Sequence, residues 1–391
     1  LGPLPPDLAS QELVRAAWEG LDPHKVWDAH AHLAGTGDST SGIRIHPDMQ
    51  SLAGLSEYAR RLFFMNAACA VDGKPSVDAA YMGRMRSLVD AFPPGFKVLL
   101  FAFERVFNAR GEIQWDSTAL YVPDAYARDL ARTHPQRFEW VASIHPYRRD
   151  CVVALEEAAR DGARAVKWLP AAMGIDPASP QCDDFYAAAA RLGMPLITHA
   201  GLERAVPGSD RQEWGNPLRL RRALDAGVRV VVAHCASMGE DRDLDAGLYG
   251  PYVSSFDLFA RLMGEKRFEG RLFGDISAIT QAVRARIALA RILRSGEWHP
   301  RLLNGSDYPL PGLMPIFSVD ALVAEGLLDA AAAPVLSRIR RHNAMLFDFV
   351  TKRLVAVEGK RLPASVFETR GFFARAGPPR GALNRTAQKI R

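Results

Sequence analysis

The sequence predicts an α/β protein built as a (β/α)₈ TIM barrel, with an N-terminal helix, a long first βα loop and a C-terminal extension. Short apolar runs, each followed by an amphipathic stretch, recur at a spacing of roughly 25–40 residues, as repeated βα units do. Three of the amphipathic stretches end in a glycine directly before the next apolar run, at Gly162, Gly193 and Gly227, which is a common helix stop signal. There are eight such runs, and eight βα units are what a barrel of this kind requires.

The apolar runs give the predicted strands, which span 26–33, 97–103, 138–144, 163–169, 195–199, 228–234, 272–276 and 301–305. Amphipathic helices are expected between them, for example over 154–161, 185–192 and 218–226. The interval between the first two strands is about twice the usual length for a βα unit. We therefore expect extra helices in this first loop, covering the mouth of the barrel.

Three segments follow from this pattern. Residues 1–25 form an N-terminal helical segment with a helix over 8–20, residues 26–350 form the barrel, and residues 351–391 form a basic C-terminal extension. A long final helix is expected over 329–354, interrupted early by Pro334 because proline breaks the helical hydrogen-bond ladder.

Composition and charge exclude some classes of protein. The chain has 391 residues, of which 48% are hydrophobic and 24% charged, and it lacks the run of about 18 apolar residues that a transmembrane helix needs. Residues 352–391 carry ten Lys or Arg and two acidic residues, which gives this tail a charge of +8. Because the net charge of the whole chain is +5, the remaining residues carry −3. Without a dense run of charges, the tail is interpreted as a solvated extension over the body, and no nucleic-acid binding is predicted.

The four cysteines (Cys69, Cys151, Cys182 and Cys235) are widely scattered and form no CxxC pair, so they are interpreted as buried thiols and not as a disulfide framework. The chain begins at Leu1 and not at Met, so its compartment is unknown; the cytoplasm is favoured, with export as the alternative. A small-molecule substrate is expected, and the oligomeric state stays open, with a homo-oligomer as one alternative.

The ends of the predicted strands carry residue types that bind metals. His30 and His32 lie at i and i+2 of the first strand, and alternate residues of a strand point to the same side. His199 and His234 end the fifth and sixth strands, and Asp307 follows the eighth. Active sites of (β/α)₈ barrels lie at the carboxyl ends of the strands, and imidazole and carboxylate groups suit borderline metals such as Zn²⁺. A metal site at the barrel mouth is therefore predicted.

Several motifs make the chain resemble the amidohydrolase superfamily, and in particular its branch of decarboxylases related to aminocarboxymuconate-semialdehyde decarboxylase and their hydrolase relatives. The resemblance covers about 26–349 and rests on Asp-Ala-His-Ala-His, Ala-Val-Lys-Trp-Leu-Pro, Thr-His-Ala-Gly, Ala-His-Cys-Ala, Gly-Ser-Asp-Tyr-Pro and His-Asn-Ala-Met-Leu-Phe. It implies that His30, His32, His199 and Asp307 bind the metal, and that His234 is a further ligand or polarises the substrate. Cys235 and Ala236 stand where relatives often have glycine.

The resemblance also implies chemical roles. One ion is expected, most simply Zn²⁺, with Mn²⁺ or Fe²⁺ as alternatives, and such an ion lowers the pKa of a bound water toward about 7. Asp307 would act as general base and then return the proton to the leaving group. His234 would donate to or stabilise the developing oxyanion.

Substrate contacts are expected from Lys167, Arg204 and Trp168, and Tyr308 is a second aromatic candidate for the pocket wall. Lys167 has three interpretations: a carbamylated bridge between two metals, a partner for a substrate carboxylate, or a lysine paired with Glu104. Arg204 suits a carboxylate but is equally compatible with a solvent-exposed position. His145 is interpreted as structural.

The sequence thus favours a metal-dependent hydrolase of a C–N or C–O bond, in an amide, lactone or ester, because the first motif is His-x-His and not the Glu-x-His of some related decarboxylases. Non-oxidative decarboxylation of an unsaturated or aromatic acid is the enzymatic alternative. A catalytically silent binding barrel is the third interpretation, and the presence of the proton-transfer carboxylate Asp307 argues against it.

Overall fold

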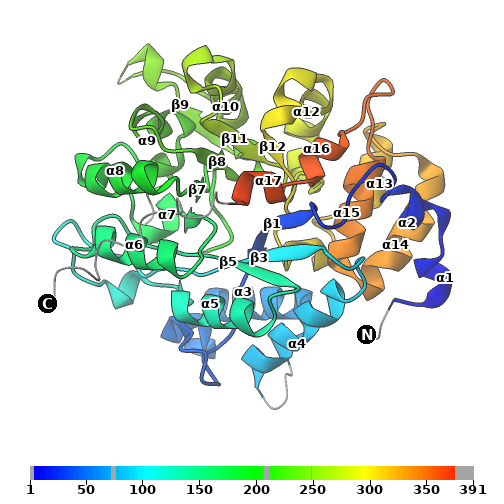
Figure 1. Cartoon of the computed structure of the whole chain (residues 1–391), viewed down its shortest axis with the longest axis horizontal. Helices are drawn as coiled ribbons and strands as arrows, with labels where there is room; N and C mark the ends of the chain where they lie inside the picture. Colours follow the sequence, from blue (N-terminus) through cyan, green and yellow to red (C-terminus); the bar gives the residue numbers. More distant parts are fainter. Residues whose placement is uncertain (1–3, 72–75, 207–210, 248, 375–391) are drawn as a thin grey trace, which may run out of the picture.

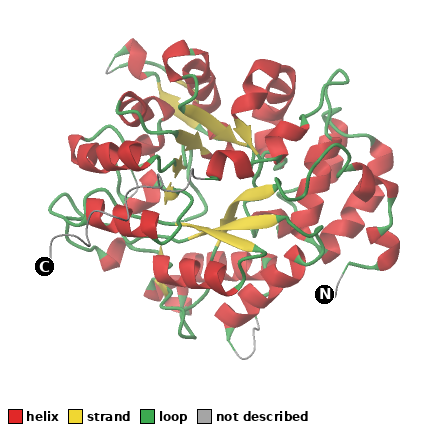
Figure 2. Cartoon of the chain, viewed as in Figure 1, coloured by secondary structure: helices red, strands yellow, loops and turns green. Residues whose placement is uncertain are grey.

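The computed structural model describes residues 4–71, 76–206, 211–247 and 249–374, and it contains the predicted α/β barrel. Figure 1 shows the strands at the centre with the helices arranged around them, and Figure 2 separates the two element types by colour. All eight predicted strands are present, although shorter than expected: β1 (Trp27–His32), β3 (Lys97–Phe101), β5 (Phe138–Val141), β6 (Val166–Trp168), β7 (Leu196–Thr198), β8 (Val230–Val232), β11 (Leu272–Asp275) and β12 (Leu302–Leu303).

The strands lie parallel in a three-stranded sheet, β1-β3-β5, and a five-stranded sheet, β12-β11-β8-β7-β6. Backbone hydrogen bonds join the two sheets at both ends. Between β5 and β6, the Ala142 N–H donates to the Ala165 carbonyl at 3.0 Å. Between β12 and β1, the Ala29 N–H donates to the Asn304 carbonyl at 3.0 Å, and the Asp307 N–H donates to the His30 carbonyl at 2.7 Å. These bonds close the strands into a barrel.

Alternation along each strand separates the interior of the barrel from its outer face. Side chains of one parity form a compact inner layer, which includes Ala29, Phe101, Ala165, Ile197 and Val231. Their neighbours in sequence pack against the surrounding helices in the main hydrophobic cluster. Because both faces are buried, the strands are apolar throughout, as in parallel sheets generally.

Helices return the chain between strands, as predicted. The helices expected over 154–161 and 185–192 are α6 (Cys151–Arg160) and α8 (Asp183–Leu192), and the one expected over 218–226 is divided into a 3₁₀ turn, η6 (Pro217–Leu220), and α9 (Arg221–Asp225). Among the others are α5 (Asp124–Thr133), α10 (Ser255–Gly264), α12 (Ala290–Arg294) and α13 (Val319–Ala324).

The long first βα loop contains the extra helices that were expected. They are α3 (Leu55–Ala67) and α4 (Val77–Val89), preceded by the short strand β2 (Arg44–Ile45), which pairs with β4 (Leu120–Tyr121). Residues of α3 line the cavity at the barrel mouth. After β8, an antiparallel pair, β9 (Glu240–Arg242) and β10 (Tyr252–Ser254), leads into α10.

The two terminal helices differ from expectation. The predicted N-terminal helix is divided into α1 (Pro6–Ala9) and α2 (Glu12–Ala16), because the extended conformation of Gln11 separates them. The long final helix is broken at Asn343, not at Pro334. Pro334 lies in the first turn of α14 (Ala333–His342), where its missing N–H costs nothing. Asn343 is extended, and its side chain caps α15 (Ala344–Leu354) by accepting a hydrogen bond from the Leu346 N–H.

The expectation of a solvated tail is wrong for residues 355–374. Two short helices follow α15, namely α16 (Ala364–Phe367) and α17 (Arg370–Phe373), and Figure 1 shows α17 across the centre of the ring of strands. Phe373 is buried in the inner layer of the barrel, and Val366 and Phe367 are buried in the main core. The prediction failed because it relied on the basic composition of the segment and not on these few apolar residues. Residues 375–391 lie outside the described residues, and the predicted segment boundary at residue 351 falls within α15.

Among the described helices, none combines the length and the apolar character needed to cross a membrane. All four cysteines are free; three are buried as expected, whereas Cys69 is exposed.

Candidate metal centre and active site

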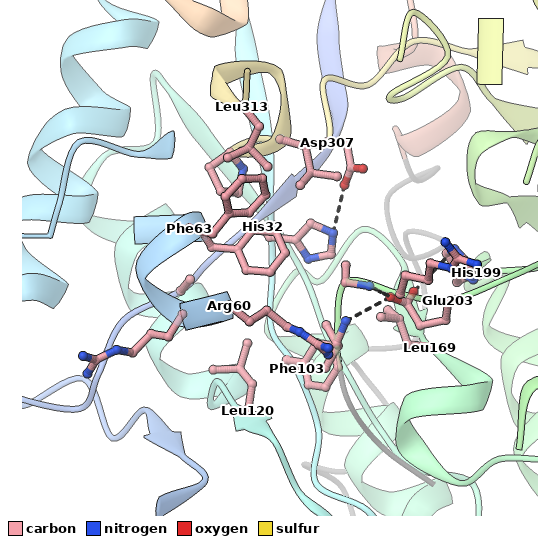
Figure 3. A pocket seen from close by; sticks show the side chains of 18 of the residues that line it. His32, Arg60, Phe63, Phe103, Leu120, Leu169, His199, Glu203, Asp307 and Leu313 are labelled. Carbon is pink, nitrogen blue, oxygen red and sulfur yellow. Dashed lines mark hydrogen bonds and ion pairs between the residues drawn. The ribbon is translucent and has the colours of Figure 1, made fainter. Parts of the chain in front are cut away.

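The predicted site residues meet at the carboxyl ends of the strands. His32, Lys167, His199, His234 and Asp307 all line one cavity of about 390 Å³. Figure 3 shows His32 and Asp307 facing one another on one wall, with His199 and Glu203 on another. The barrel order of the strands, inferred from sequence, is therefore what gathers these groups.

Among the described residues, two compact groups of potential metal ligands lie here, His30 with His32 and Asp307, and His30 with His234 and Asp275. The first of these groups lies at the cavity, which His32 and Asp307 line. Its two imidazole Nε2 atoms are 3.2 Å apart. Asp307 Oδ1 lies 3.3 Å from Nε2 of His30 and 3.1 Å from Nε2 of His32. The other carboxylate oxygen of Asp307 is 3.7 Å from Nε2 of His234. Three ligand atoms thus converge on one point, and a fourth group stands beside them.

This convergence requires a close approach between the backbones of β12 and β1 and a strained backbone at Asp307. Gly305 precedes Asp307 by two residues, and a Cβ atom at Gly305 would lie only 2.5 Å from Cβ of His30. Only glycine permits this approach between β12 and β1. Asp307 itself has a positive φ of 61°, a conformation that non-glycine residues adopt at a cost and that is frequent at active sites.

Asp275, at the end of β11, orients two of the histidines. Its Oδ2 accepts a hydrogen bond from His30 Nδ1 at 2.8 Å, and its Oδ1 accepts one from the His234 backbone N–H at 2.9 Å. The Ser277 hydroxyl donates to the same Oδ1. His234 Nδ1 donates to the Ser277 carbonyl at 2.9 Å. Both imidazoles therefore carry their proton on Nδ1, and each directs the lone pair of Nε2 toward Asp307.

Burial controls the protonation of the site. It lowers the pKa of His30 and of His199 to about 4, and it lowers the pKa of His234 well below its usual value. Neutral imidazoles are the form that binds metals. Burial also acts to raise the pKa of Asp307, but the neighbouring His234, His30 and His32 outweigh it and hold this pKa well below its usual range. At neutral pH the site thus presents the ionised carboxylate of Asp307 beside the neutral imidazoles of His30, His199 and His234.

His199 faces the same cavity but stands apart from the compact group. Its Nε2 lies 3.4 Å from Oε2 of Glu203, four residues further along the chain. Its ring centroid is 5.5 Å from that of His234. Among the described residues, neither compact group of potential ligands includes His199.

Lys167 is buried beside the candidate ligands. Its Nζ lies 3.3 Å from Nε2 of His30, and burial lowers its pKa to about 8. The interpretation of Lys167 as a partner of Glu104 is wrong, because Glu104 pairs with Arg105 at 2.8 Å and with Arg148 at 2.6 Å. The carbamylated bridge and the carboxylate partner stay open.

The remaining candidates are distributed differently. Arg204 is exposed and lines the cavity mouth. Trp168, however, does not reach the cavity: it follows Lys167 in β6, so it points outward, donates to the Ile144 carbonyl and packs against Phe185. Tyr308 is also fully buried, in contact with Tyr81 and away from the cavity lining. The expectation that these two aromatic residues wall the pocket is therefore wrong, and for Trp168 the reason is strand alternation.

His145 is structural, as expected: its Nε2 donates to the Met173 carbonyl, and Nδ1 accepts from the Tyr147 N–H. Cys235 and Ala236, which stand after β8 where relatives often have glycine, adopt a backbone conformation that favours glycine. Together with His234 they have positive φ angles, between 51° and 55°. Three consecutive non-glycine residues in this region store strain at the point where His234 enters the site.

Two buried residues of the site were missed in the sequence. Asp275 lies inside the seventh predicted strand, and a carboxylate near the end of a barrel strand was a usable signal. Arg284 lies in α11 (Ala282–Arg284), after β11, and lines the cavity while being 4% exposed. Nothing in its local sequence distinguishes it from a surface arginine.

The donor set fits a metal ion. Two imidazole nitrogens and a carboxylate oxygen that lie within 3.3 Å of one another, with His30 and Asp307 buried and His32 half-buried, are a set that borderline divalent metals bind. The hydrogen bonds of His30 and His234 through Nδ1 fix the orientation in which metal-binding histidines are usually held.

Comparison with known proteins defines the class. The sequence model of the amidohydrolase family matches residues 27–346, and the chain belongs to this family of enzymes. No curated protein matches the sequence.

Many solved structures are similar to this chain, among them the following three. An uncharacterized TIM-barrel protein from Bordetella bronchiseptica is 15% identical, with a TM-score of 0.47 over 82% of this chain and 99% of that one. A putative 2-pyrone-4,6-dicarboxylic acid hydrolase from Pseudomonas putida is 17% identical, with a TM-score of 0.44 over 89% and 97%. A 5-carboxyvanillate decarboxylase from Novosphingobium aromaticivorans, complexed with manganese, is 12% identical, with a TM-score of 0.44 over 90% and 96%.

Proposed function

We propose that this enzyme is a metal-dependent hydrolase that cleaves a C–N or C–O bond of a small amide, lactone or ester. The observation that carries the proposal is the convergence of His30, His32 and Asp307, whose ligand atoms lie 3.1–3.3 Å apart at the floor of the cavity. A carboxylate in this position combines ligation with proton transfer, which a silent binding barrel does not need.

The proposed metal ligands are His30, His32, His199 and Asp307, and one Zn²⁺ ion is the preferred occupant, with Mn²⁺ or Fe²⁺ as alternatives. His199 is the least supported of the four, since its Nε2 lies beside Glu203. When bound, such an ion supplies a Lewis acid that polarises the substrate carbonyl and activates a water molecule.

Asp307 is the proposed general base. Its low pKa keeps it ionised at neutral pH, so it accepts a proton from the attacking water and returns it to the leaving group. Oδ2, which faces His234 and not the ligand group, is the oxygen available for this transfer.

His234 is better suited to accept than to donate. Its Nδ1 proton is engaged by the Ser277 carbonyl, and burial disfavours a second proton. The role of hydrogen-bond donor to an oxyanion, expected from the resemblance, needs the protonated ring. We therefore propose that the Nε2 lone pair orients the attacking water, or serves as a further ligand.

Lys167 and Arg204 are proposed substrate contacts at opposite ends of the cavity, one at the floor and one at the mouth. Lys167 also has the position needed for a carbamylated bridge, and the number of bound ions separates the two roles.

Elemental analysis tests the metal centre. Protein purified without added metal is expected to hold about one equivalent of zinc, and the His30→Ala/His32→Ala variant is expected to lose it, because both proposed imidazole ligands of β1 are absent. Two equivalents would assign Lys167 to a carbamylated bridge. Equal metal content in both proteins, or none after reconstitution, would contradict the proposal.

Asp307→Asn tests the proton transfer. It is expected to lower kcat by roughly 10²- to 10⁴-fold, with an unchanged circular dichroism spectrum and most of the metal retained. Asp320→Asn, an exposed aspartate of α13, is the control and should behave as the wild type. Full activity of the Asp307 variant would refute its role.

Product analysis in ¹⁸O-labelled water separates hydrolysis from decarboxylation. Incorporation of one ¹⁸O atom into the product is expected for a hydrolase. Release of carbon dioxide without incorporation would replace the hydrolase proposal with the decarboxylase alternative.

A further inference from the structure

We propose that Arg284 is a specificity-determining residue that binds the anionic group of the substrate, and that the substrate is an amphiphilic monoanion with an aryl or alkyl body. This inference rests on the proposed function for the location of the reacting bond. The recognition of an anion by Arg284 has a separate physical basis, because it uses the cavity lining and a cation outside the candidate ligand set. Only the charge balance that favours a single negative charge also counts the bound ion.

The surroundings of Arg284 leave its charge without a direct counter-ion. Its Nε donates to Gln281 Oε1 at 3.0 Å, and its Nη1 donates to the Ser237 hydroxyl at 3.2 Å. Both partners are neutral. In the part of the chain that the structure describes, no carboxylate forms an ion pair with Arg284, although the residue is only 4% exposed. Buried guanidinium groups are normally paired, since an isolated buried charge is costly.

Arg284 also borders open space. It lines the same cavity as Lys167, His234 and Asp307, and the hydrogen bonds to Gln281 and Ser237 fix its orientation. A planar guanidinium held in this way presents a preformed fork for a carboxylate. An anion delivered by the substrate would therefore complete a site that the protein leaves incomplete.

The charge balance of the cavity floor favours a monoanion. Asp275, Asp307 and Glu203 are the buried acids of this region, and Lys167 and Arg284 are the buried bases. A divalent cation added to this set leaves one surplus positive charge. A ligand with a single negative charge neutralises it, whereas a neutral ligand leaves the surplus buried.

The rest of the cavity requires an apolar body. Above the floor, its walls consist mainly of aromatic and aliphatic side chains, among them Phe63, Phe64, Phe103, Leu120, Leu313 and Ile316. Figure 3 shows Phe63 and Leu313 on one side of the opening and Phe103 and Leu120 on another. Small polar acids would leave this surface in contact with water, so a hydrophobic group of the substrate is needed to cover it.

The experiment compares ligands that differ in one feature. The dissociation constants of 4-phenylbutyrate, of 4-phenylbutan-1-ol, which lacks the charge, and of acetate, which lacks the body, are measured by calorimetry. Wild type and Arg284→Met are titrated as purified and after metal removal. Arg286→Gln, two residues further on at an exposed ion pair with Glu325, is the matched control.

Wild type is expected to bind 4-phenylbutyrate at least 10-fold more tightly than either of the other two ligands. Arg284→Met is expected to weaken 4-phenylbutyrate binding by about 10- to 100-fold, to leave binding of the alcohol unchanged, and to retain the metal. Arg284→Lys keeps the positive charge but lacks the planar guanidinium, so its affinity for 4-phenylbutyrate should lie between those of wild type and Arg284→Met. Arg286→Gln should match the wild type.

Equal binding of 4-phenylbutyrate by wild type and Arg284→Met would overturn the inference, as would equal binding of the acid and the alcohol. If Arg284→Met fails to fold, the Arg284→Lys variant and the wild-type comparison of acid with alcohol decide the matter. Because the titrations are repeated without metal, loss of carboxylate recognition is distinguishable from failure of the metal-centre proposal.

Discussion

At the scale of single residues, the site depends on groups that hold the candidate ligands as much as on the ligands. Asp275 accepts hydrogen bonds from the ring of His30 and from the backbone of His234, and it receives the Ser277 hydroxyl. One buried carboxylate therefore fixes the tautomer of one histidine and the position of another. Such outer partners of metal-binding histidines contribute strongly to metal affinity.

Replacement of Asp275 by Asn is therefore expected to weaken zinc binding by about 10- to 100-fold. The neutral amide is a weaker acceptor for the Nδ1 proton of His30 than the carboxylate, and its orientation is divided between donor and acceptor. Competition with a chromophoric chelator measures the effect. Asp257→Asn, at an exposed ion pair with Arg291, is the control, and zinc affinities that coincide in the two variants would show that Asp275 does not orient the site.

At the scale of elements, hydrogen bonds anchor the loop after β5 to the helix that precedes this strand and to the next strand. Asp124, the first residue of α5, accepts a hydrogen bond from the Ser143 N–H at 2.8 Å. The Ser143 hydroxyl in turn donates to the Lys167 carbonyl at 2.9 Å. Burial, helped by the charge of Glu104, raises the pKa of Asp124 to about 7.

The raised pKa of Asp124 predicts a pH dependence of stability. The unfolded chain ionises near the ordinary value of 3.8 and the folded protein only near 7, so the folded state binds an extra proton between these values. The contribution to stability is complete below about pH 4 and is lost as the pH rises toward 7, at about 1.4 kcal/mol per unit.

Asp124→Asn removes this titration while keeping an oxygen to accept from Ser143. The free energy of unfolding of the wild type is therefore expected to fall relative to that of the variant between pH 4 and pH 7. Urea denaturation at several pH values measures the difference. A constant difference across this range would contradict the assignment of the raised pKa.

At the scale of the whole molecule, the barrel has a functional end and a sealed end. The carboxyl ends of the strands surround the cavity, whereas α17 brings Phe373 against the inner layer that contains Trp27, Leu99 and Leu303. The connection is reinforced where the buried Lys352 of α15 donates to the Gly305 carbonyl and to Asp348, both at 2.6 Å. The C-terminal segment thus supports β12, which precedes Asp307.

Phe373→Ala is expected to destabilise the whole barrel by about 3–5 kcal/mol, because it removes a buried aromatic side chain and leaves a cavity. The neighbouring ring of Phe372 is only half-buried, so Phe372→Ala should cost clearly less. Chemical denaturation of both variants provides the comparison. Equal stability of Phe373→Ala and the wild type would mean that α17 only covers the surface of the barrel.

Much of the fold could be predicted because its signals are local and repetitive. Apolar runs and terminal glycines identified all eight strands, and β1 with its two histidines was recognisable from alternation alone. The expectation of Trp168 as a substrate contact was wrong, although the same alternation places Trp168 outward once Lys167 faces inward. The break at Asn343 was not recognised, because a proline in the first turn of a helix is harmless whereas a capping asparagine begins a new one.

The sequence by itself determined the barrel, the order of its strands and the gathering of His30, His32, His199, His234 and Asp307 at one end, because strand periodicity and chain order fix which side chains share an edge. Only the tertiary structure decided that Asp275 orients the histidines, that Arg284 is buried without a counter-ion, and that the basic tail carries Phe373 into the barrel. These features depend on contacts between residues far apart in the chain, and neither composition nor periodicity records which distant groups share a buried volume.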